Sequence, residues 1–235
     1  MPSTLFVVCM IASCGLTTGV RVISPPERRS STINSVVFEH ALPQNDDVGF
    51  QGYELYYKIY GNNQSEAQEA DENAIEGTSD PFSVLNERGF RRFQLEDIDR
   101  ERPPVIAHVI PPVDEPVTFS LDFLRATGPS PESNPVLLIE RGDADPVEYR
   151  LVRTIQAAPG DFGSEASRRA FNEPGEPRWL VDGSDDAAPH ADVDSDYDGI
   201  SQVSILIYAI GQALDVNTLT PIRSLDALQL IEIEL

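Results

Sequence analysis

Three aspartates at alternate positions form the sharpest chemical motif in this 235-residue chain. Asp194, Asp196 and Asp198 lie in the stretch DVDSDYDG, which ends at Gly199. This pattern matches the start of a calcium-binding loop, in which carboxylates supply hard oxygen ligands and glycine permits the sharp turn. A helix–loop–helix site also needs a bidentate Glu at its twelfth position, which counted from Asp194 is Ile205. Two hypotheses stay open: a calcium loop completed by other carboxylates, and a solvated acidic loop.

Motifs for catalysis are scarce elsewhere in the chain. Of the three histidines, His40 and His108 fall within expected strands, where we predict packing or surface roles, and His190 lies in an acidic stretch. The chain contains no Gly-x-Ser-x-Gly elbow, no His-Glu-x-x-His and no phosphate-binding Gly-rich loop. With 39 acidic residues, a close pair of carboxylates of the glycosidase type would arise by chance. The sequence therefore assigns no catalytic residue.

Tyrosines in residues 52–60, GYELYYKIY, offer a binding surface instead. The stretch alternates at period two, which is typical of a half-buried strand. Tyr56 and Tyr60 share one face with Glu54 and Lys58, where they either lie under the second of two insertions or form an exposed binding patch. On that face we expect Glu54→Ala to change stability little. The opposite face is predicted to enter the core and carries Tyr53, Leu55, Tyr57 and Ile59.

The overall charge excludes several classes of function. The chain has 17 Lys and Arg against 39 Asp and Glu, which gives a net charge of −22. Nucleic-acid binding and docking on anionic lipid through a basic surface both need positive charge, so we expect neither. An apolar content of 40% favours a folded body, and 15 glycines with 19 prolines fit a turn-rich β protein.

Both cysteines, Cys9 and Cys14, lie near the start of the chain, so the remaining body has no disulfide framework. Residues 5–12 form an apolar run that is shorter than the roughly 20 residues of a transmembrane helix but suits a signal peptide. The run ends in Ile-Ala-Ser-Cys, which resembles the lipobox of bacterial lipoproteins. The resemblance implies cleavage before Cys14 and acylation of that residue, although residues 1–13 lack the usual Lys or Arg. The alternative is a buried N-terminal strand with two free cysteines.

The rest of the chain predicts an all-β protein, an antiparallel β-sandwich of eight or nine short strands with no long helix. Asp80-Pro81 can cap one helical turn that Gly89 ends. Two long acidic insertions, 61–79 and 157–200, interrupt the strands, and we expect the first to be a mobile surface segment. We expect a signal peptide over 1–13, a tether over 14–33 and a single domain over 34–235. The predicted strands are 35–42, 52–60, 90–98, 105–110, 117–123, 135–140, 147–155, 201–212 and 228–234.

The stretches GYELYYKIY, SILIYAIGQALD and LQLIEIEL resemble the central strands of a fibronectin type III-like or immunoglobulin-like sandwich. In that family a Tyr-rich third strand pairs with a late strand carrying a tyrosine, and here residues 53–57 and Tyr208-Ala209 take those places. Together with the lipobox, the pattern is similar to envelope lipoproteins of spirochaete-type bacteria. The resemblance implies a domain that binds a partner or acts as a spacer, and it implies no catalytic residues.

These observations predict a protein anchored by lipid to a membrane of a bacterial cell envelope, with a binding or structural role and no enzymatic activity. Its partners would be the membrane and an unidentified protein or glycan. We expect no cofactor, with calcium at the aspartate loop as the alternative. The alternatives are an exported carbohydrate-active enzyme and a calcium-stiffened carbohydrate-binding or adhesion module. Arg141-Gly142-Asp143 is an integrin-type tripeptide, which we expect to be an ordinary hairpin turn.

Overall fold

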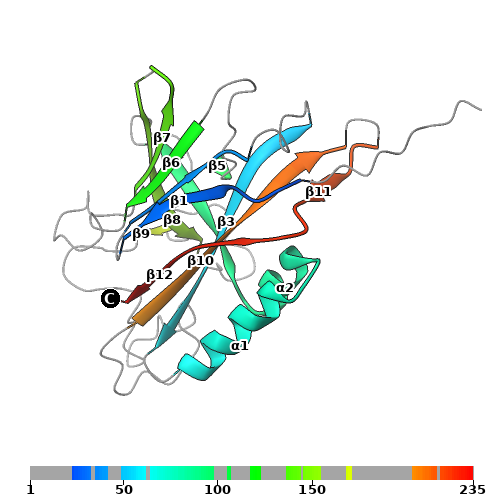
Figure 1. The fold of residues 1–235 in the computed structure, drawn as a ribbon. Helices are drawn as coiled ribbons and strands as arrows, with labels where there is room; N and C mark the ends of the chain where they lie inside the picture. The colour runs from blue at the N-terminus through cyan, green and yellow to red at the C-terminus, as the bar shows by residue number, and fades with distance from the viewer. Residues whose placement is uncertain are drawn as a thin grey trace, which may run out of the picture.

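The described residues of this computed structural model build two antiparallel sheets and two helices (Figure 1). The protein is thus predominantly β, as the sequence predicts, and the arrangement is compatible with a β-sandwich. The structure describes residues 23–32, 35–41, 49–61, 64–97, 105–106, 117–122, 136–143, 145–154, 168–170, 203–215 and 218–234.

One sheet has six strands along its main path, and each neighbouring pair is antiparallel. From edge to edge these strands are β1 (Glu27–Ser31), β2 (Ser35–Glu39), β6 (Val117–Asp122), β7 (Val136–Arg141), β8 (Val147–Thr154) and β4 (Arg91–Asp97). Two short strands extend it, β5 (Val105–Ile106) beside β4 and β9 (Arg168–Ala170) beside β8. The predicted hairpin turn lies between β7 and β8, where Gly142 adopts a positive φ of 50° that glycine tolerates.

The second sheet is built around two long strands that are far apart in sequence. β3 (Phe50–Gly61) pairs with β10 (Val203–Leu214) along almost its whole length. The first residues of β4 pair with β3 and the remainder with β8, so β4 joins the two sheets. β11 (Pro221–Arg223) and β12 (Leu228–Glu234) pair with opposite halves of β10. The prediction that strong strands near both ends of the chain pair with each other is confirmed.

Two helices cover the outer face of β3 and β10. Figure 1 shows α1 (Ser65–Glu76) and α2 (Pro81–Glu87) on the side of these strands away from β6 and β7. The prediction of a mobile segment over 61–79 was wrong for α1, because its Glu, Gln and Ala residues favour a helix and because Asp71 and Ile75 hold its inner face. The short helix predicted after Asp80 is confirmed as α2.

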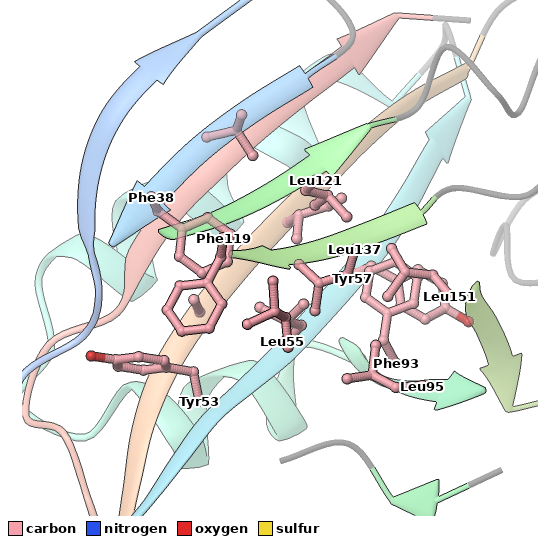
Figure 2. Close-up of a cluster of buried hydrophobic side chains, with 14 of the residues drawn as sticks. Phe38, Tyr53, Leu55, Tyr57, Phe93, Leu95, Phe119, Leu121, Leu137 and Leu151 are labelled. Atoms are coloured by element: carbon pink, nitrogen blue, oxygen red, sulfur yellow. The ribbon is translucent and has the colours of Figure 1, made fainter. Parts of the chain in front are cut away.

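An apolar core fills the space between the two sheets, as Figure 2 shows. Aromatic rings pack closely in it: the centroids of Phe38 and Phe119 are 5.0 Å apart, and those of Tyr57 and Phe93 are 4.3 Å apart. The core face predicted for residues 52–60 is confirmed. The buried residues of the whole core are Val36, Phe38, Tyr53, Leu55, Tyr57, Ile59, Phe93, Leu95, Val117, Phe119, Leu121, Leu137, Ile139, Leu151, Ile205, Ile207 and Ala209.

The first described residues are docked on the domain. Ile23 is buried, and a Cβ added to Gly211 of β10 would lie 2.6 Å from both the Ile23 Cγ2 atom and the Ser24 carbonyl oxygen. Only glycine permits so close an approach of the backbone. β1 then occupies Glu27–Ser31. The second half of the tether predicted over 14–33 is therefore part of the folded body.

The N-terminal cap of α2 gives a first testable prediction. The Asp80 carboxylate accepts hydrogen bonds from the Ser83 backbone N–H (3.2 Å) and the Ser83 hydroxyl (2.7 Å), and these bonds lower the pKa of Asp80. Asp80→Ala should lower the free energy of unfolding by about 1 kcal/mol, a typical value for a lost cap, as measured by urea denaturation. Asp80→Asn keeps the acceptor oxygen and should retain most of the stability at neutral pH. Equal losses in the two variants would contradict the capping role.

Candidate functional site

Polar side chains on the outer face of β3 meet the helices in two charge clusters, each built around a buried carboxylate. Glu54, Tyr56, Lys58 and Tyr60 alternate with the core residues of the same strand. The two tyrosines also belong to an apolar cluster that lies between the sheet and the helices. Its buried residues are Tyr56, Tyr60, Ile75, Leu85, Phe90, Leu206, Tyr208 and Ile210.

The first cluster surrounds the Glu54 carboxylate, which is completely buried. Arg92 Nη1 of β4 donates to Oε1 at 2.7 Å, while Oε2 accepts from the Tyr56 hydroxyl at 3.0 Å and Arg223 Nε of β11 at 3.4 Å. The Arg223 guanidinium also lies 3.5 Å from the centre of the Phe82 ring in α2, a cation–π contact. Glu54 thus ties together β3, β4 and β11, and Arg223 extends the connection to α2.

The second cluster surrounds Asp71, the buried carboxylate of α1. Its Oδ2 accepts from Lys58 Nζ at 2.6 Å and from the Tyr60 hydroxyl at 2.9 Å, and its Oδ1 accepts from Arg88 Nη1 at 3.2 Å. Lys58 also donates to the Arg88 carbonyl oxygen at 2.7 Å. α1 therefore docks on the sheet through one carboxylate and one apolar side chain, Ile75.

These contacts fix what the clusters can do chemically. Burial is the main reason that the pKa values of Tyr56 and Tyr60 are raised far above their usual range, and the adjacent Glu54 and Asp71 raise them further. Both phenols therefore stay protonated at neutral pH and act as hydrogen-bond donors to the carboxylates. Each carboxylate is bonded to two cations and one phenol. This arrangement holds the helices to the sheet.

Tyr56 and Tyr60, for which the sequence leaves open either an exposed patch or cover by the second insertion, are both buried. The covering element is the first insertion, through α1 and α2, rather than the second. The same covering overturns the expectation that removal of the Glu54 side chain has little effect on stability, because the carboxylate is buried and paired with two arginines.

The remaining predicted sites lie outside the described residues. These sites are the lipidation residue Cys14 and the calcium ligands Asp194, Asp196 and Asp198. In the part of the chain that the structure describes, no three His, Cys, Asp or Glu side chains gather to hold a metal ion. Neither described helix has the length and apolarity needed to cross a bilayer.

A third buried polar contact lies at the margin of the core. His40 Nδ1 and the Tyr53 hydroxyl are 2.9 Å apart, and the same hydroxyl accepts from the Ala41 backbone N–H at 2.9 Å. The His40 ring also contacts Phe50, with centroids 5.1 Å apart. The packing role predicted for His40 agrees with these contacts.

The two buried tyrosines next to carboxylates predict a loss of stability in alkali. The folded state holds their protons more tightly than the unfolded chain does, so their contribution is complete below the ordinary tyrosine pKa of about 10 and is lost as pH rises beyond it. Each tyrosine should add about 1.4 kcal/mol per pH unit to the fall in the free energy of unfolding. Urea denaturation on both sides of this pH measures the slope. An unchanged slope in Tyr56→Phe/Tyr60→Phe would contradict this assignment.

Comparison with known proteins adds no relative to this picture. No protein-family model matches the chain, and neither a curated protein nor a solved structure matches it.

Proposed function

We propose that this chain is a lipid-anchored β-sandwich protein of a bacterial cell envelope, with a binding or structural role and no catalytic role. The observation that carries the proposal is the sequence Ile11-Ala12-Ser13-Cys14 at the end of an apolar run. Several acyl chains on one residue give stable membrane attachment, whereas a single chain binds only marginally. An exported protein also fits a body without cysteine after Cys14.

The pairing of β3 with β10 supports a fibronectin type III-like or immunoglobulin-like sandwich. In the register, Tyr56 lies opposite Tyr208 and Leu55 lies opposite Ala209, so the Tyr-rich strand meets the late strand that carries a tyrosine. The final strand, β12, pairs with β10 at Ala209 as well. This order of a Tyr-rich strand, a late strand and a last strand is the one that the family resemblance implies.

The charge clusters support a structural role for the acidic residues beneath the helices. Glu54 and Asp71 each bind two cationic side chains and a phenol within the fold. A general acid or base must reach a substrate proton, and these carboxylates face the inside of the domain instead. With a net charge of −22, the outer surface suits a protein or glycan partner better than a nucleic acid.

The test is to express the full chain in a bacterium that processes lipoproteins and to follow its partition between detergent and aqueous phases. We expect the wild type to enter the detergent phase with a mature N-terminus at Cys14 that carries acyl chains, as measured by mass spectrometry. Cys14→Ala should remain unacylated and uncleaved. Cys9→Ala is the matched control, because the same substitution in the signal peptide should leave acylation intact. A wild-type protein that keeps Met1 and stays in the aqueous phase would refute the anchor.

A further inference from the structure

The edge of the second sheet at β11 carries exposed apolar side chains. The two strongly exposed large apolar residues of the described chain, Leu219 (71% exposed) and Leu225 (52%), flank this three-residue strand. Within the strand, Pro221 is exposed and Ile222 is half-buried. We call these four residues, Leu219, Pro221, Ile222 and Leu225, the β11 rim.

Leu219 is held in its exposed position by a constrained turn. Its φ of 56° is uncommon for a residue other than glycine, and such conformations persist where the surrounding structure imposes them. Here the Leu219 N–H donates to the Asp215 carbonyl oxygen at 2.7 Å, and the Asp215 N–H donates to the Thr220 carbonyl oxygen at 2.9 Å. The hydroxyls of Thr218 and Thr220 are 2.6 Å apart. The turn therefore fixes an apolar side chain in water.

The rim lies beside the point where the N-terminal segment enters the domain. The Ser224 N–H donates to the Gly211 carbonyl oxygen at 2.9 Å, and the Gly211 N–H donates to the Ser224 hydroxyl at 3.0 Å. Ile23 and Ser24 approach the same glycine, so the entering chain and the residue before Leu225 meet there. Figure 1 likewise shows β11 next to the start of β1.

The length of chain before Ile23 limits how far this corner can lie from an anchor at Cys14. Residues 15–22 separate the two positions. At full extension they span about 30 Å, from roughly 3.3–3.6 Å per residue. An anchored domain is therefore confined near the bilayer, and the corner that carries the β11 rim is the part attached most closely.

We propose that the β11 rim is a membrane-contacting surface that rests on the lipid bilayer holding the acyl chains of Cys14. This inference rests on the proposed lipid anchor. Apolar side chains gain free energy by leaving water, and confinement by the anchor raises their effective concentration at the bilayer. A protein of net charge −22 is repelled by anionic lipid, so its contact with a membrane has to be apolar.

The experiment places a polarity-sensitive fluorophore on the rim of the full, processed protein in phosphatidylcholine vesicles. Leu219→Cys and Leu225→Cys provide the attachment sites. In the proposed mature protein Cys9 is removed and the Cys14 thiol is acylated, so the introduced cysteine is the only free thiol. We expect blue-shifted emission and strong quenching by nitroxide-labelled lipid. Asp143→Cys, at the exposed β7–β8 turn of the first sheet, is the control and should show neither.

Each outcome separates the rim from the anchor. Mass spectrometry of the same samples reports acylation, and an unacylated protein would refute the proposed function. An acylated protein whose rim probes respond like the Asp143 probe would overturn the rim proposal alone. A second copy of the chain could cover the rim instead. Blue-shifted emission that grows with the protein-to-lipid ratio, together with disulfide cross-linking between two copies of the unlabelled Leu219→Cys variant, would show this and would also overturn the proposal. Leu219→Asn suits the positive φ and should weaken the lipid quenching of a probe at Leu225→Cys.

Discussion

Replacing Tyr57 by alanine is expected to lower the free energy of unfolding by about 3–5 kcal/mol, which is typical for deleting a buried aromatic side chain. Tyr57 is buried in the core, and its ring stacks on Phe93 with an interplanar angle of 24°. The backbone around it is fixed by pairing with Ile207 of β10 and Arg91 of β4. The cavity left by alanine therefore lies where neighbouring strands have little freedom to close it. Denaturation by urea or heat measures the loss.

Tyr149 of β8 supplies the matched control for Tyr57. It is the same residue type and packs against the same core, but it is only partly buried. Tyr149→Ala should cost clearly less, because part of its ring already contacts water in the folded state. Similar losses for the two variants would contradict the placement of Tyr57 at the centre of the core.

Replacing Arg92 by methionine is expected to lower the free energy of unfolding by about 3 kcal/mol, because it leaves a buried carboxylate short of its closest cation. Glu54 is completely buried, whereas the Arg92 and Arg223 side chains are 34% and 26% exposed. Glu54→Gln should therefore cost less than Arg92→Met, since both arginines can turn toward water. In Glu54→Gln/Arg92→Met the loss should fall below the sum of the single losses.

Arg29→Met is the control for a surface ion pair. Arg29 pairs with Glu39, but its own side chain is 60% exposed, and pairs of that kind contribute about 0–1 kcal/mol. Equal losses for Arg92→Met and Arg29→Met would show that Glu54 is not enclosed as the structure has it.

Nine of the described strands were predictable because their information is local, whereas the short strands β1, β9 and β11 were not predicted. In β3 the period-two alternation places Tyr53, Leu55 and Tyr57 on one face, and burial in the core follows directly. α2 was predictable for the same reason, since its start is marked by two adjacent residues, the capping Asp80 and Pro81 at the first helical position. α1 was missed because most of its surface faces water and its composition is acidic. The spacing of Asp71 and Ile75, one helical turn apart, is the signal that could have revealed it.

The charge clusters depended on long-range contacts that local patterns do not contain. Arg92 and Arg223, the partners of Glu54, lie 38 and 169 residues away from it in sequence. Their pairing follows only once β3, β4 and β11 are assembled. A hydrophobic pattern also cannot identify a face that is buried through paired charges, which is why the sequence leaves open whether the outer face of β3 is covered or exposed.

The contact between Lys58 and Asp71 has a practical consequence for labelling. Lys58 is the single lysine of the chain, since the other basic residues are arginines. Its amine is occupied by the Asp71 carboxylate and the Arg88 carbonyl oxygen. In a mature form with an acylated N-terminus, an amine-reactive reagent would have one target, and that target reacts slowly while α1 is docked. The rate of its modification would report how often α1 leaves the sheet, on the intact protein and without an introduced probe.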